Sequence, residues 1–122
     1  MKGRAIALAV LLLAGPSHAF VAQNGLRVED RGPGEFHVPY SSLSGARAFW
    51  CAAGDYAIRV LHVHPATRIY RTSAPRRASG EGISFSLSSE NATSPGLLRL
   101  SGSRGLTAGN ARFQCELTRR RD

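Results

Sequence analysis

Residues 44–62, SGARAFWCAAGDYAIRVLH, carry the strongest periodic pattern in the chain and decide its fold class. Apolar side chains recur there at steps of three and four residues. At about 100° per residue they cover one stripe roughly 140° wide, which predicts an amphipathic helix packed on a sheet. Asp55 and Arg59 lie opposite the stripe as an i,i+4 pair, and Pro65 marks the end of the helix. The stripe consists of Ala46, Phe49, Trp50, Ala53, Tyr56, Ala57, Val60 and Leu61.

Gly54 leaves a second interpretation of this stretch open. A glycine inside a helix costs about 1 kcal/mol relative to alanine. The helix could instead stop at Ala53, with a strand running from Tyr56 to Val63. Because the apolar stripe continues past Gly54, the single long helix is the favoured interpretation.

The sequence on both sides of this helix alternates between apolar and polar residues, as strands do. The first two alternating runs enclose a turn signal, RGPG at 31–34, and so predict a hairpin. In the last run Phe113, Cys115 and Leu117 share one inward face. The predicted strands are 26–28, 36–40, 67–72, 83–88, 97–101 and 111–117, with polar or glycine-rich connectors at 73–80 and 102–109.

The first 19 residues have the layout of a secretory signal peptide. Lys2 and Arg4 precede an apolar run of ten residues, and SHA at 17–19 places small residues before a cut at Phe20. Ten residues are too few to span a bilayer, which needs about 20. We therefore expect an exported protein, periplasmic or extracellular, with no transmembrane segment in its mature chain.

The remaining chain is short enough for one domain, which we place at 20–118 with a basic tail at 119–122. Its two cysteines, Cys51 and Cys115, predict a disulfide, because an even pair in an exported protein is normally bonded. Cys51 flanks the apolar stripe of the helix, and Cys115 points inward from the last predicted strand. The expected fold is α+β: an antiparallel sheet of about five or six strands, one amphipathic helix across one face and a single disulfide.

Arginine dominates the charge of the mature chain, which has 14 Arg, no Lys and 8 acidic residues, a net charge of +6. Arg68 and Arg71 flank Tyr70, and Arg76 and Arg77 lie in the connector at 73–80. Arginine beside an aromatic ring can bind phosphate, so these four residues form a candidate anion-binding site. The same pattern is also typical of a solvated basic surface. In the periplasm the expected partners are anionic envelope components or another protein, not nucleic acid.

His62 and His64 are the only pair with metal-like spacing. On a strand both imidazoles would face one side, and His37 or Asp55 could complete a zinc site. At the end of a helix such a pair is more typical of exposed polar residues. The sequence therefore predicts no metal and no cofactor, with His62 and His64 as the weak candidates.

Hydrolase motifs are missing from the sequence: it has neither G-x-S-x-G nor S-x-x-K, and its acidic residues are scattered. We predict no catalytic residue. The favoured function is a small non-enzymatic periplasmic protein, a binding or envelope-interaction module. The alternative is a metal-dependent or other small periplasmic enzyme that uses the region of His62 and His64.

The run AFWCAAGDYA at 48–57 resembles a segment of small, uncharacterised exported proteins of alphaproteobacteria. The similarity extends through RIYR at 68–71 and GISFSL at 82–87 to the second cysteine, and so covers most of the mature chain. This resemblance implies export. It brings no activity with it.

Overall fold

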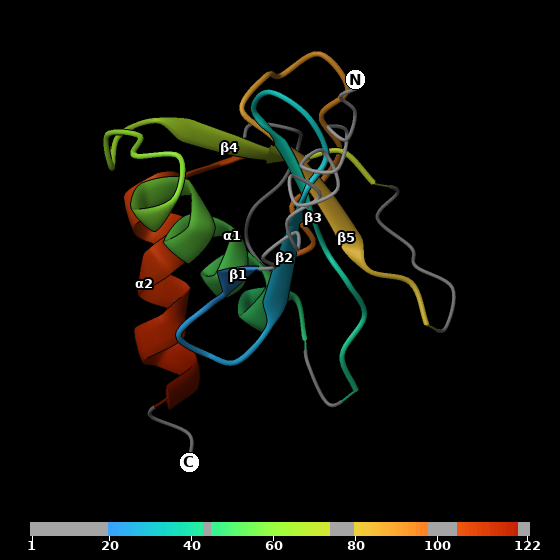
Figure 1. Cartoon of the computed structure of the whole chain (residues 1–122), viewed down its shortest axis with the longest axis vertical. Helices are drawn as coiled ribbons and strands as arrows, with labels where there is room; N and C mark the ends of the chain where they lie inside the picture. Colours follow the sequence, from blue (N-terminus) through green and yellow to red (C-terminus); the bar gives the residue numbers. More distant parts are fainter. Residues whose placement is uncertain (1–19, 43–44, 74–79, 98–104, 120–122) are drawn as a thin grey trace, which may run out of the picture.

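An antiparallel sheet of six strands and two α-helices make up the part of the chain that the structure describes (Figure 1). Helix α1 (Ala46–Arg59) lies across one face of the sheet, and helix α2 (Ala108–Arg119) packs against α1. The predicted α+β fold, with one helix across one face of an antiparallel sheet, is confirmed; the second helix, α2, was not predicted. This computed structural model describes residues 20–42, 45–73, 80–97 and 105–119.

The strands are short and follow the order β1-β2-β3-β5-β4-β6, with every neighbouring pair antiparallel. The predicted strands at 26–28, 36–40, 67–72 and 83–88 are confirmed with shorter or shifted bounds. Strands β1 and β6 were not predicted, because a run of two residues carries no visible alternation. In chain order the strands are β1 (Phe20–Val21), β2 (Arg27–Asp30), β3 (Glu35–Val38), β4 (Arg68–Arg71), β5 (Ile83–Ser86) and β6 (Leu106–Thr107).

Helix α1 is the centre of the fold. It runs unbroken through Gly54 to Arg59, so the long helix is confirmed and the alternative strand from Tyr56 is wrong. Nine consecutive residues, Phe49–Ala57, are buried. A helix packed on a sheet alone would leave its outer face in water; α1 is enclosed because α2 covers the side that faces away from the sheet (Figure 1).

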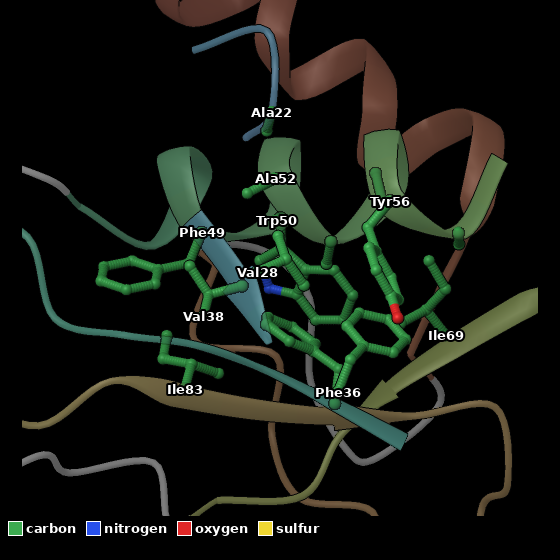
Figure 2. Close-up of a cluster of buried hydrophobic side chains, with 14 of the residues drawn as sticks. Ala22, Val28, Phe36, Val38, Phe49, Trp50, Ala52, Tyr56, Ile69 and Ile83 are labelled. Atoms are coloured by element: carbon green, nitrogen blue, oxygen red, sulfur yellow. The ribbon is translucent and has the colours of Figure 1, made fainter. Parts of the chain in front are cut away.

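Aromatic side chains fill the space between α1 and the sheet (Figure 2). The ring centroids of Phe36 and Tyr56 lie 4.8 Å apart, and those of Trp50 and Phe85 lie 4.9 Å apart. The Trp50 indole N–H donates a hydrogen bond of 2.9 Å to the carbonyl oxygen of Pro95. The polar end of this buried ring is therefore satisfied, as burial requires.

Helix α2 occupies the position of the predicted strand at 111–117, which is therefore wrong. The Asn110 N–H donates a 3.1 Å hydrogen bond to Thr107 Oγ1, so Thr107 caps the helix. Phe113, predicted to face inward, is 55% exposed. Most residues at 111–117 are good helix formers: alanine, arginine, glutamine, glutamate and leucine. Their helix propensity outweighs the apolar–polar alternation that predicted a strand.

The two helices approach so closely that their backbones touch at Gly54. A Cβ atom at this position would lie 2.3 Å from the backbone nitrogen of Arg112 and 2.9 Å from the carbonyl oxygen of Ala108. Ala108 and Ala111 present small, fully buried side chains on α2. Glycine at 54 is thus the residue that lets α2 lie directly against α1.

The predicted disulfide between Cys51 and Cys115 is confirmed, with an S–S distance of 2.03 Å and a Cα–Cα distance of 4.7 Å. Both residues are buried. The bond joins α1 to α2 rather than a helix to a strand. It therefore holds together the same two helices that meet at Gly54.

Several predicted segments lie outside the described residues: the signal peptide at 1–19, residues 98–101 of a predicted strand, and residues 120–122 of the basic tail. Arg119, the first residue of that tail, is the last residue of α2. Within the described ranges no helix is both long enough and apolar enough to cross a membrane.

Candidate functional site

Two of the four predicted anion-binding residues, Arg68 and Arg71, are described by the structure, and they lie on opposite faces of β4. Arg68 is exposed, whereas Arg71, three residues further along β4, is only 2% exposed, because side chains an odd number of positions apart leave opposite faces of a strand. A Cβ atom at Gly96 would lie 2.6 Å from Arg71 Nη1, so the loop at 92–97 covers this guanidinium. Arg76 and Arg77 lie outside the described residues. Of the two candidates that the structure describes, Arg68 lies at the surface and Arg71 does not.

His62 and His64, the weak metal candidates, follow the end of α1. His62 is exposed and has a positive φ of 55°, and His64 Nδ1 accepts a 3.0 Å hydrogen bond from the Ala66 N–H. His37 is on β3, and its Nδ1 and Ser84 Oγ form a 2.8 Å hydrogen bond. Nowhere in the described ranges do three His, Cys, Asp or Glu residues lie close enough to hold a metal ion.

Asp55 forms a buried charged cluster instead. Its side chain is 0% exposed and pairs with Arg59 Nη1 at 3.0 Å and Arg112 Nε at 3.6 Å. The Gln23 backbone N–H donates a further 2.9 Å hydrogen bond to Asp55 Oδ2. The predicted pair with Arg59 is confirmed, but Asp55 is buried because α2 covers it. A buried carboxylate paired in this way joins α1, α2 and the segment after β1.

A polar groove of about 410 Å³ lies on the sheet face that turns away from α1. Its floor comes from β3, β5 and the end of β4, and one wall comes from the residues that follow β5. Neither arginine nor lysine is among its described lining residues. They are Glu35, Thr72, Ser73, Ser84, Ser86, Ser88, Glu90 and Asn91.

Strand register places the groove residues side by side. Because residues alternate along β5, Ile83 and Phe85 enter the core while Ser84 and Ser86 face the groove. In the β3–β5 pair, Glu35 lies opposite Ser86. The serine alternation is visible in the sequence and predicts that these serines share a face. Sequence reasoning missed the groove itself.

Three serine hydroxyls of the groove accept hydrogen bonds from the backbone. Ser73 Oγ accepts from the Ser84 N–H at 3.2 Å, Ser86 Oγ from the Ser88 N–H at 3.0 Å, and Ser88 Oγ from the Glu90 N–H at 3.2 Å. A hydroxyl has one donor and two acceptor positions. In the described part of the chain no bond donated by these three O–H groups is found, so the groove offers donors beside its carboxylates.

Similarity to known proteins does not assign a role to these residues. Comparison with protein-family models, curated proteins and solved structures found no match. The resemblance to exported proteins of alphaproteobacteria thus stays a prediction.

His37, at the edge of the groove, is expected to titrate below the ordinary histidine pKa of 6.5. Burial lowers its pKa, nearby Arg31 lowers it further, and Glu29 partly opposes both. Because the folded protein binds this proton less readily than the unfolded chain, the contribution of neutral His37 to stability is complete above pH 6.5 and declines below it. NMR titration of the imidazole measures the midpoint, and His37→Gln should remove this part of the pH dependence. A midpoint at or above 6.5 would contradict the burial described here.

Proposed function

We propose that this protein is a small, non-enzymatic binding module of the bacterial cell envelope, exported to the periplasm and attached to anionic envelope components through arginine. The distribution of charge carries this proposal. The described residues contain 8 arginines and 7 acidic residues and are nearly neutral. The other 6 arginines of the mature chain, with a single acidic residue, belong to the segments 74–79, 98–104 and 120–122.

Contacts within the fold account for most of the described arginines. Arg31 pairs with Glu29 at 2.6 Å, Arg119 pairs with Glu116 at 3.8 Å, and Arg59 and Arg112 both pair with Asp55. Arg71 is buried. In the sequence, the positive surplus is therefore concentrated in the three short segments 74–79, 98–104 and 120–122. A local excess of guanidinium groups attracts phosphate-rich surfaces and bonds to them in a bidentate manner.

Two observations support the envelope as the place of action. The Cys51–Cys115 disulfide fits an oxidising compartment, where such bonds persist. Residues 1–19 have the signal-peptide pattern. In that compartment the phosphate groups of lipids and lipopolysaccharide are the abundant anions.

Sedimentation with vesicles tests this proposal. Mature protein (20–122) should bind vesicles rich in phosphatidylglycerol at low salt and be released as salt rises. Replacing Arg76 and Arg77 with alanine should weaken binding roughly tenfold or more, since each arginine near an anionic surface contributes about 1 kcal/mol. The matched control replaces the exposed Arg27 and Arg47 and should bind more tightly than the first variant. Absent binding at low salt, or binding that ignores salt, would reject the proposal.

A further inference from the structure

The polar groove points to a second site, independent of the arginine-rich segments. We propose that it binds an uncharged, polyhydroxylated ligand, namely a short stretch of saccharide. All eight described lining residues carry a polar side chain, and none is aromatic or aliphatic. A groove of this kind gains little from apolar surface and recognises its ligand by hydrogen bonds.

The hydrogen-bonding groups in the groove match those of a sugar. Each sugar hydroxyl both donates and accepts a hydrogen bond. The O–H groups of Ser73, Ser86 and Ser88 can donate, because the hydrogen bonds that these hydroxyls make among the described residues use only acceptor positions. Glu35 and Glu90 supply acceptors, and a hydrogen bond to a charged group is among the stronger ones in proteins.

The negative charge of the groove disfavours an anionic ligand. Glu35 and Glu90 are both exposed carboxylates, and the described lining has no cationic side chain to offset them. A phosphate or sulfate group would meet repulsion here. The groove and the arginine-rich segments therefore select different chemical groups, and a glycan with charged substituents would place its uncharged units in the groove.

The floor of the groove is built on a strand that is paired on both sides. Ser84 and Ser86 are on β5, which pairs with β3 on one side and β4 on the other. The Ser84 hydroxyl is further held by His37 at 2.8 Å. A preformed floor lowers the entropy cost of binding. The volume of about 410 Å³ lies within the range of small-molecule sites, about 300–1,000 Å³.

NMR titration of the mature protein with two uncharged probes, maltotetraose and the tetramer of N-acetylglucosamine, tests the inference. We expect saturable amide shifts with at least one probe, confined to Ser84, Ser86, Glu90 and their neighbours. The dissociation constant should be on the order of 1 mM for so open a site. Inorganic phosphate at the same concentration should leave these amides unchanged.

Glu90→Ala should weaken saccharide binding about tenfold, because it removes a charged acceptor. The matched control is Glu116→Ala, an exposed acidic residue on α2, which should bind as the wild type does. Both residues are exposed, so both variants should fold. The inference is overturned if neither saccharide shifts the groove amides at about 10 mM, if the shifts lie elsewhere, or if only calcium or phosphate produces them. Vesicle binding should be unaffected by Glu90→Ala. The two experiments therefore test saccharide binding in the groove and arginine-based attachment to the envelope independently.

Discussion

Replacing Gly54 with alanine should lower the free energy of unfolding by about 3 kcal/mol or more, or prevent folding. The added Cβ atom would lie 2.3 Å from the Arg112 backbone nitrogen and 2.8 Å from the Ala111 carbonyl carbon. Backbone atoms cannot rotate aside as a side chain can. The helices would have to separate, although the disulfide holds them together.

Helix propensity alone predicts the opposite sign for the change in stability, so the sign distinguishes the two effects. In an exposed helix the same substitution would stabilise by about 1 kcal/mol. Urea unfolding of the variant measures the difference. The control is Gly45→Ala at the N-cap of α1, where a Cβ atom meets nothing within 4 Å and the loss should be no more than about 1 kcal/mol. A Gly54→Ala protein as stable as the wild type would mean that α2 does not cross α1 at this point.

Removing the disulfide by replacing Cys51 and Cys115 with alanine should cost about 2–5 kcal/mol. The bond closes a loop between residues 64 positions apart and joins two helices of the core. Its loss raises the conformational entropy of the unfolded chain. It also leaves cavities at two buried positions of the folded protein. In a small domain this is a large share of the total stability. Urea unfolding of oxidised, reduced and variant protein measures the cost.

Reductant provides the control for this second experiment. It should destabilise the wild type and leave the alanine variant unchanged. Intact-mass analysis of exported protein should show the mass of the bonded form. Two thiols that react with an alkylating agent without reductant would contradict the bond and favour a reactive cysteine.

Helix α1 was predictable from the sequence, whereas α2 was not, for a reason visible in its residues. A step of four positions keeps two residues on one face in both a strand and a helix, so Phe113 and Leu117 satisfy either period. Ala108, Ala111 and Cys115 carry the helical spacing, with steps of three and four. This run is weakened by the glycine that precedes Asn110, and the cap at Thr107 could be recognised only from its hydrogen bond.

The candidate sites were harder to predict from the sequence than α2, because tertiary contacts bring their residues together. Serine alternation on β5 predicts a hydroxyl face, but Glu35 joins it only through strand register, and Glu90 only through the course of the chain after β5. Arg71 has the same local sequence character as the exposed Arg68. Strand alternation puts Arg71 on the same face as Ile69, opposite Arg68, but its cover also needs the loop at 92–97, which no pattern within β4 indicates.

Because α2 encloses α1, the core can finish folding only after α2 has been synthesised. A chain that emerges amino end first presents α1 (Ala46–Arg59) long before α2 (Ala108–Arg119). Until then the side of α1 around Cys51 and Gly54 has no cover, and Cys51 has no partner. Strands β1 to β5 and α1 can associate early, but the enclosure of α1 and the oxidation of Cys51 wait until α2 has emerged. Removing α2 would therefore expose the centre of the molecule and not merely its edge.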